Sequence, residues 1–160
     1  MPTKPFRRKD AIDQILTGFP RRNGQVVRLL YRKADTSLPC GMAALLGALE
    51  ERPQRITELA AREGLAQPTV TRMITRLENQ GLAIRTQDRD DRRVVTVAIT
   101  DEGREQLRAL RASFSDVLRE SLAAMSDEHV DGLARATEAL EALIETLRER
   151  PRRNTRGAPV

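Results

Sequence analysis

Several residue types that carry much of protein chemistry are nearly absent from this chain. Its 160 residues include one histidine, one cysteine, one tyrosine and no tryptophan. A hydrolase with a serine or cysteine nucleophile would therefore have to use His129 as its base. A zinc site needs several cysteine and histidine ligands, more than this single chain supplies. The composition disfavours an enzyme, and we expect no catalytic residues, no metal and no cofactor.

Long apolar runs are absent as well. The longest, residues 38–49, is far shorter than the roughly 20 residues that a membrane-spanning helix needs. The basic residues 1–10 are not followed by the apolar region of a signal peptide. The single Cys40 excludes an internal disulfide, and a reducing compartment is the default for such a chain. We therefore expect a cytoplasmic protein without a membrane partner.

Arginine is abundant, and its distribution along the chain is uneven. The chain has 25 arginines and 3 lysines, and the planar guanidinium suits phosphates and guanine edges. Residues 52–93 carry 9 basic and 6 acidic side chains, a net charge of +3, whereas residues 94–149 carry 6 and 12, a net charge of −6. This asymmetry favours a polyanion-binding face in the middle of the chain, although a mixed solvated surface would give the same counts.

The apolar spacing predicts a mainly helical chain. Apolar residues recur at helical intervals over residues 12–19, 26–34, 38–49, 55–63, 67–80, 101–124 and 127–147. Pro20, with Gly18 before it, is expected to break or kink the first helical region. Thr57 and Thr100 are suited to cap helix N-termini.

A short turn and a change of period mark the middle of the chain. The predicted helices 55–63 and 67–80 are joined by a turn that contains Gly64, which is typical of a helix-turn-helix. Gly81 ends the second helix, and residues 82–87 and 94–99 then alternate as β-strands do. A two-stranded hairpin is marginal alone and has to pack on the helices before it. The fold predicted for residues 38–100 is a winged helix-turn-helix.

The outward side of the predicted helix 67–80 carries short polar groups and arginines, with no acid before Glu78. Such groups near a helix N-terminus fit the major groove of DNA, and the N-terminal amides can face a phosphate. An ordinary amphipathic helix with a soluble outer face is the alternative. We predict DNA contacts by Gln67, Pro68, Thr69, Thr71, Arg72, Thr75 and Arg76.

The tip of the predicted hairpin, residues 88–93, is densely charged. Its three arginines suit a narrow minor groove, whose negative potential attracts guanidinium groups. Its three aspartates would repel phosphate, so we expect at least one of them to pair with an arginine. A solvated charged turn is one alternative. Metal binding by the aspartates is another, although nothing like a calcium loop follows them.

Three motifs together resemble the MarR (multiple antibiotic resistance regulator) family. They are Ile56-Thr-Glu-Leu-Ala-Ala-Arg-Glu-Gly-Leu, Pro68-Thr-Val-Thr-Arg-Met-Ile-Thr-Arg-Leu-Glu-Asn-Gln-Gly-Leu, and Asp88-Arg-Asp-Asp-Arg-Arg followed by Thr100-Asp-Glu-Gly. In element order the resemblance covers residues 25–148, and it is strongest over 56–107.

This resemblance implies a bacterial transcription regulator, typically a repressor, that binds a pseudo-palindromic double-stranded operator as a homodimer. The helix 67–80 would enter the major groove and the wing the minor groove. On the family pattern Arg93 is the minor-groove residue and Asp91 its supporting partner, so the wing contacts would be Arg89, Asp91, Arg92 and Arg93. Many members release DNA when a small-molecule effector binds, but the residues do not locate an effector pocket here.

The implied organisation has four parts. Residues 38–100 would form the DNA-binding domain, and residues 10–36 with 101–148 the helical dimerisation region. Residues 1–9 and 149–160 are expected to be a flexible basic N-terminus and a disordered basic tail. Two features depart from the family. Ala66 replaces the usual capping serine or aspartate of the recognition helix, where Pro68 can offset the loss, and residues 39–41 replace a common Thr-x-x-Gln.

Long apolar stripes independently favour a dimer. Stripes near the N-terminus and in both C-terminal helices exceed what one chain with so little aromatic mass covers, and a partner subunit is the natural cover. A self-contained helical subdomain is the alternative. The expected interface residues are Val130, Leu133, Leu140, Ile144 and Leu147.

Two single residues and two other functions complete the predictions. Some family members sense peroxide through a cysteine, but Cys40 lies among small apolar residues without an obvious cation to lower its pKa. We expect a buried structural thiol there, and an exposed His129 without a role. Besides a ligand-responsive repressor, the sequence leaves open an architectural DNA-binding protein without an effector and a redox-sensing regulator.

Overall fold

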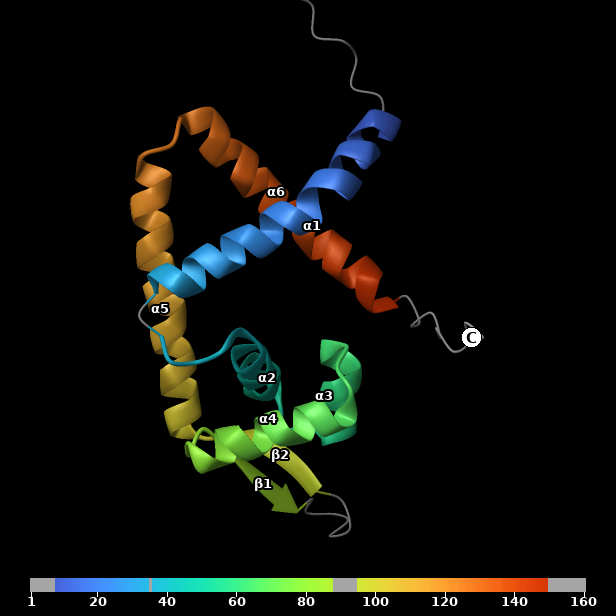
Figure 1. Ribbon diagram of the computed structural model, residues 1–160, viewed down its shortest axis with the longest axis vertical. Helices are drawn as coiled ribbons and strands as arrows, with labels where there is room; N and C mark the ends of the chain where they lie inside the picture. Colours follow the sequence, from blue (N-terminus) through green and yellow to red (C-terminus); the bar gives the residue numbers. More distant parts are fainter. Residues whose placement is uncertain (1–7, 35, 88–94, 150–160) are drawn as a thin grey trace, which may run out of the picture. The chain divides into compact units, whose positions relative to one another are not determined.

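The computed structural model describes residues 8–34, 36–87 and 95–149. Its helices are α1 (Arg8–Lys33), α2 (Cys40–Glu51), α3 (Ile56–Glu63), α4 (Gln67–Asn79), α5 (Asp101–Ala123) and α6 (Asp127–Glu149), and its strands are β1 (Ala83–Gln87) and β2 (Val95–Ile99) (Figure 1). The predicted fold class, mainly α with a small β-hairpin, is confirmed. Residues 8, 9 and 149, expected in the tails, lie in α1 and α6 instead. The rest of the expected tails and the wing tip at 88–93 lie outside the described residues.

The chain divides into two compact units, Met1–Arg119 and Glu120–Val160. The first contains α1 to α4, the hairpin and most of α5. The second contains the end of α5 and all of α6. No helix of the described ranges combines the length and the apolar character needed to cross a lipid bilayer.

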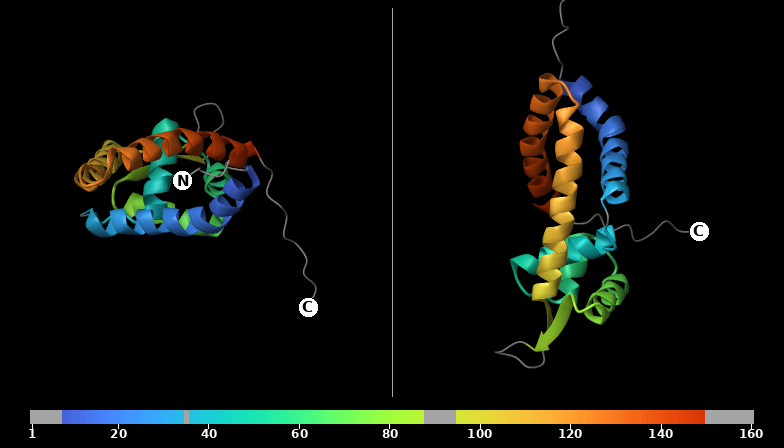
Figure 2. Two further views of the ribbon diagram at one scale, coloured as in Figure 1. Left: turned by 90° about the horizontal axis from the view of Figure 1, so that it is seen from above. Right: turned by 90° about the vertical axis from the view of Figure 1, so that its left-hand side faces the viewer.

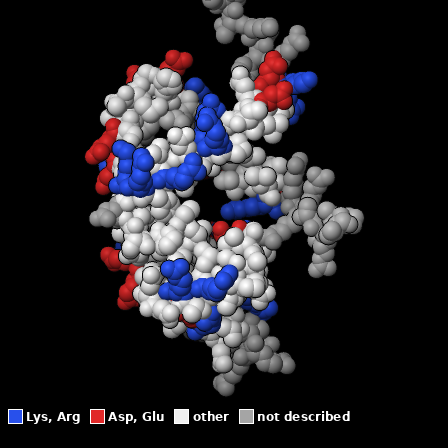
Figure 3. Space-filling view, in the orientation of Figure 1, with Lys and Arg blue, Asp and Glu red and all other residues white. Residues whose placement is uncertain are grey.

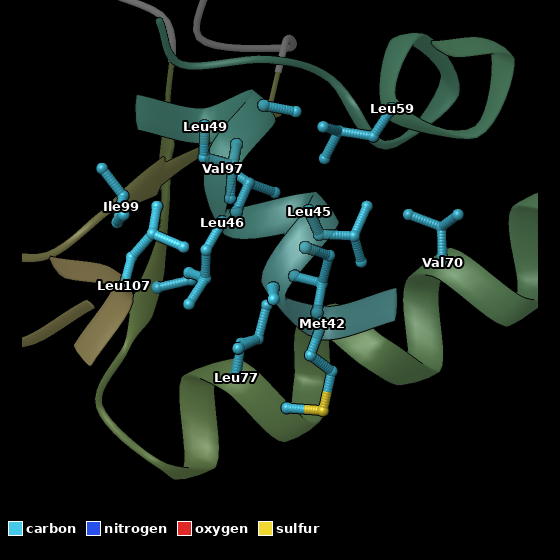
Figure 4. Close-up of a cluster of buried hydrophobic side chains, with 14 of the residues drawn as sticks. Met42, Leu45, Leu46, Leu49, Leu59, Val70, Leu77, Val97, Ile99 and Leu107 are labelled. Carbon is cyan, nitrogen blue, oxygen red and sulfur yellow. The ribbon is translucent and has the colours of Figure 1, made fainter. Parts of the chain in front are cut away.

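The core of the first unit is built around α2. The predicted stripe on this helix is buried, and Leu45, Leu46 and Leu49 are at most 1% exposed. Side chains from α3, α4, β2 and α5 meet this stripe (Figure 4). Because α2 is surrounded on several sides, it reads as almost continuously apolar rather than amphipathic. This cluster holds α4 by its apolar side and leaves the other side of the helix exposed to solvent.

Of the break or kink predicted at Gly18 and Pro20, the break is wrong. α1 runs without interruption from Arg8 to Lys33, with Pro20 inside it. A proline removes one N–H donor from the helix ladder, and in a long exposed helix water can replace that bond at the freed carbonyl. Gly18 is buried because the guanidinium of Arg22 folds back over it.

The hairpin pairs antiparallel, with Ala83 opposite Ile99 and Gln87 opposite Val95. A third segment extends it, because Gln54 exchanges backbone hydrogen bonds with Val97 at 3.0 and 2.8 Å. The side chain of Gln54 is buried and donates to the carbonyl of Ala48. Figure 2 shows the hairpin beside α4, with α5 continuing from β2. The wing is therefore fixed to the end of α2 as well as to α4.

The start of α5 confirms the predicted Thr100 cap and adds to it. The Thr100 hydroxyl accepts from the N–H of Gly103 at 3.0 Å and donates to the carbonyl of Gly81 at 2.7 Å. Gly81 has a φ of +72°, which turns the chain from α4 into β1. One hydroxyl thus joins the end of the helix-turn-helix to the first turn of α5.

The predicted cap at Thr57 is wrong by two residues. α3 begins at Ile56 with Arg55 as N-cap, and the Arg55 N–H donates to the Glu58 carboxylate at 2.8 Å. This backbone hydrogen bond lowers the pKa of Glu58. Helix starts can be satisfied by an acid in the first turn instead of a capping hydroxyl, which makes their exact position hard to read.

The second unit exposes its apolar seam. Leu133, Ile144 and Leu147 are 49%, 46% and 60% exposed, and Val130 and Leu140 are half-buried. His129 is exposed, as predicted, and its Nδ1 lies 2.8 Å from the hydroxyl of Ser126 at the start of α6.

Candidate nucleic-acid interface

The predicted recognition helix is α4, and a tight turn sets its direction. Gly64 has a φ of +71° and ends α3 as predicted, so that only Gly64, Leu65 and Ala66 join the two helices. Ala66 forms no side-chain capping bond, and Pro68 stands in the first turn. Because proline has no N–H, it reduces the number of donors that a cap would have to satisfy.

The outer side of α4 is polar and basic. Val70 and Leu77 face the core (Figure 4), as does Ile74. Arg72, Thr75 and Arg76 are exposed on the other side. Gln67 and Pro68 are also exposed, and Thr69 and Thr71 are half-buried. All seven predicted contact residues therefore lie on the first three turns of one helix, away from its buried stripe.

The two arginines on this face have no fixed partner within the part of the chain that the structure describes. Neither Arg72 nor Arg76 is in an ion pair there, whereas Arg62, Arg85 and Arg111 each bind an acid. Basic side chains gather over α4 in the lower half of Figure 3. Unpaired guanidinium groups on an exposed helix are available to a phosphate or a guanine edge.

Two of the three threonines of α4, Thr71 and Thr75, donate their hydroxyl protons within the helix. The Thr71 hydroxyl donates to the carbonyl of Gln67 at 2.9 Å, and the Thr75 hydroxyl donates to the carbonyl of Thr71 at 3.0 Å. A hydroxyl has one proton and two lone pairs, so these side chains present acceptors to a partner.

Sequence reasoning missed Arg85, the residue on β1 that contacts the recognition helix. Its guanidinium binds the carboxylate of Glu78 and lies 3.4 Å from the Thr75 hydroxyl. Glu78 is the first acid along α4. Because the chain reverses directly after α4, β1 passes back over the last turns of this helix. The available signal in the sequence was an arginine in a strand that contains no acidic residue, a short distance after Glu78.

The predicted wing residues Arg89, Asp91, Arg92 and Arg93 lie outside the described residues, and their contacts stay a prediction. The strands that lead to them are described. Thr86 and Thr96 face each other across the ladder, with their hydroxyls 3.1 Å apart. This pair fixes the register of the hairpin close to its tip.

The prediction that Cys40 is a buried thiol is wrong. Cys40 is exposed at the start of α2, beside Tyr31 of α1. Burial, the charge of Cys40 and a hydrogen bond to it raise the pKa of Tyr31 to about 12. The Tyr31 ring packs edge-on against Phe114 of α5, with centroids 5.0 Å apart. The apolar neighbours in the sequence face the core, while Cys40 begins the helix on its outer side.

Comparison with known proteins finds similarity to one family over the winged helix. A model of the MarR family matches residues 43–95. Over 65 residues the chain is 34% identical to the HTH-type transcriptional repressor MdtR of Bacillus subtilis, a match that covers 41% of this chain and 42% of the length of that relative.

Solved structures share the fold over most of the chain. A MarR family protein from Bacillus stearothermophilus superimposes with a TM-score of 0.71 at 19% identity, over 88% of this chain and 99% of the other. The PcaV transcriptional regulator from Streptomyces coelicolor, solved in complex with its natural ligand, gives a TM-score of 0.58 at 22% identity, over 80% and 94%. Over its winged helix, residues 43–95, this chain is similar to the MarR family, and it shares the fold of a solved MarR family protein.

Proposed function

We propose that this protein is a sequence-specific DNA-binding regulator of transcription that acts as a homodimer on a two-fold operator. The observation that carries the proposal is the outer face of α4, where Arg72 and Arg76 are exposed beside threonine acceptors. Arginine guanidinium groups and short hydrogen-bond acceptors on a recognition helix are the groups that read base edges in the major groove. The similarity to the transcriptional repressor MdtR favours repression as the direction of control.

A wing contact would complete the interface. Arg93 would enter the minor groove beside the site that α4 reads, with Asp91 holding its guanidinium in position. The position of the wing supports this, because β1 and β2 extend directly from the end of α4 and from the start of α5.

A small-molecule effector would bind where it can move the recognition helix. A hollow of about 250 Å³ is lined by Ser37, Leu38, Gln80, Leu82 and Gln106. Gln80 directly follows α4, so a molecule bound here would press on the end of that helix. The volume is slightly below that of drug-sized pockets, so a compact molecule with hydrogen-bonding groups fits best.

Selection of bound fragments from the source genome tests the proposal. A regulator recovers a small set of fragments that share a two-fold motif, and it binds this motif at least about 10³ times more tightly than random duplex at physiological salt. An architectural DNA-binding protein recovers fragments without a motif. That outcome, or no recovery at all, would refute sequence-specific regulation.

Variants of α4 test the assignment within the site. Arg72→Ala is expected to cost about 1–3 kcal/mol and to relax the preference at one base pair, since Arg72 lies nearer the helix N-terminus. Arg108→Ala, on α5, is the matched control and leaves the binding unchanged. If Arg72→Ala weakens binding to all sequences equally, Arg72 contacts a phosphate and does not read a base.

A further inference from the structure

Arg85 of β1 and Glu78 of α4 are joined twice. The backbone N–H of Arg85 donates to one carboxylate oxygen of Glu78 at 3.2 Å, and its guanidinium donates to the other at 2.5 Å. The Arg85 and Glu78 side chains are 35% and 22% exposed, so solvent screens the pair less than a fully exposed one. The second guanidinium nitrogen of Arg85 lies 3.4 Å from the hydroxyl of Thr75.

The fold places these three residues together through two features. Thr75 and Glu78 are three residues apart on α4 and therefore share one side of the helix. Gly81 then reverses the chain with a φ of +72°, so that β1 passes back along that side. One arginine on β1 thus reaches both residues.

The Thr75 hydroxyl is left with a single free lone pair. Its proton goes to the carbonyl of Thr71 at 3.0 Å, and one of its two lone pairs faces the guanidinium of Arg85. A group in this state accepts a hydrogen bond and donates none. In the major groove the amino groups of adenine and cytosine donate, whereas guanine O6 and thymine O4 only accept.

The charge of Glu78 matters for the same face. Glu78 is the only acid on α4, and without Arg85 its carboxylate would be free to repel the phosphates near Arg76. Arg85, which lies on β1, cancels this charge locally.

We propose that Arg85 is a positioning residue for DNA recognition, which neutralises Glu78 and orients the Thr75 hydroxyl so that its free lone pair accepts from an adenine or cytosine amino group at one position of the site. The inference rests on the proposed DNA-binding function, and it adds a residue of the wing strand to the determinants of base preference.

A double-mutant cycle tests the neutralisation. The wild-type protein first selects a duplex from a random-sequence library, and that duplex is then titrated with Arg85→Ala, Glu78→Gln and the double variant. Arg85→Ala is expected to lose about fivefold or more in affinity, and Glu78→Gln in the same chain to restore most of it. If Arg85→Ala costs the same factor in both backgrounds, Arg85 contacts a phosphate directly and the proposal is wrong.

Repeated selection tests the base preference, which a purely structural role would not alter. Thr75→Val removes the hydroxyl at nearly constant shape, and Thr75→Ser keeps it. The valine variant and Arg85→Ala are expected to lose the preference for adenine or cytosine at the same base pair, and the serine variant to retain it. An unchanged preference in Arg85→Ala, or a loss at a different base pair, overturns the proposal.

Two controls keep the outcomes distinct. Thermal unfolding followed by circular dichroism shows whether Arg85→Ala is folded. If it is not, Arg85→Lys takes its place, because it keeps the charge beside Glu78 but lacks a second nitrogen for Thr75. This variant is expected to keep the affinity within about twofold and to lose the base preference. If the wild-type protein selects no sequence, the proposed function fails before Arg85 is tested.

Discussion

Gly103 lies directly against the carbonyl oxygen of Leu82. A Cβ on Gly103 would overlap that oxygen and approach Ile99 Cγ1 to 2.8 Å. The same carbonyl accepts the N–H of Thr100 at 3.2 Å, so the first turn of α5 is fastened to the segment that follows α4. The glycine of the Thr-x-x-Gly motif is therefore required by close packing against backbone, which cannot move aside as a side chain can.

Gly103→Ala is expected to destabilise the protein by about 1–3 kcal/mol or more, because the added methyl group meets a backbone carbonyl. Gly47→Ala is the matched control. Gly47 lies inside α2, and among the described residues nothing beyond its local helix lies within 4 Å of an added Cβ. Alanine there should stabilise the protein by up to about 1 kcal/mol, through helix propensity. Chemical denaturation measures both, and equal effects would contradict the packing argument.

Gln54→Leu is expected to cost about 1 kcal/mol or more, because a buried side chain loses its hydrogen bond to the Ala48 carbonyl. The backbone pairing of Gln54 with Val97 remains possible in this variant, so the change isolates the side chain. Gln87→Leu, at the exposed end of β1, should change the free energy of unfolding by less than about 0.5 kcal/mol. A Gln54 variant as stable as the wild type would show that the buried amide contributes nothing.

Tyr31 should titrate near pH 12 instead of pH 10.0, first because of burial and then because of Cys40. Since the chain has one tyrosine and no tryptophan, the ultraviolet absorbance of tyrosinate reports this residue alone. Because the pKa of Tyr31 is raised in the folded state, the contribution of this residue to the free energy of unfolding is complete below pH 10 and is lost between pH 10 and 12. Cys40→Ala should lower the midpoint, and Tyr31→Phe should remove this part of the pH dependence. A midpoint unchanged by Cys40→Ala would contradict the contact.

Ile144→Glu is expected to dissociate the proposed homodimer, since it places a charge in the apolar seam of α6 at a cost of about 2 kcal/mol or more. Leu140→Glu should act in the same way. Ala142→Glu, an exposed position between them in sequence and off the seam, is the matched control and should stay dimeric. Light scattering at micromolar concentration reports the mass. A folded monomeric wild type that binds a two-fold site tightly would refute the dimer.

Asp91→Ala adds a net positive charge, so simple electrostatics predicts tighter DNA binding. We expect weaker binding, because Arg93 without its partner has to lose more conformational entropy on docking. Arg93→Ala should weaken binding and flatten its salt dependence, since a cation leaves the interface. Titration of the selected duplex at several salt concentrations decides between the two. Tighter binding by Asp91→Ala would leave the wing as a plain charged turn.

The order of the elements and the buried stripes could be predicted from the sequence because the signals are local. Gly64 and Gly81 end helices by adopting positive φ, and the stripes of α2 and α4 follow the helical period. These signals depend on neighbours within one or two turns of chain. They were therefore sufficient to place α4 and its outward residues.

The errors and omissions concern contacts between distant segments. The bridge from Gln54 to Val97 and the contact of Arg85 with Thr75 depend on how the hairpin returns over the helices, which no local pattern records. The exposure of Cys40 depends on which side of α2 faces the core, and its first residue falls on the outside. Pro20 was misread because a long helix tolerates the loss of one hydrogen bond.

The pairing of Gln54 with Val97 has a consequence for how the wing opens. The amide of Val97 is bound to a segment that precedes α3, so fraying of the hairpin from its tip does not release it. Its hydrogen exchange should follow the opening of the whole winged helix, whereas amides nearer the tip exchange through local fraying. The protected end of the hairpin is thus a stable hinge point, and any motion of the wing on DNA begins beyond it.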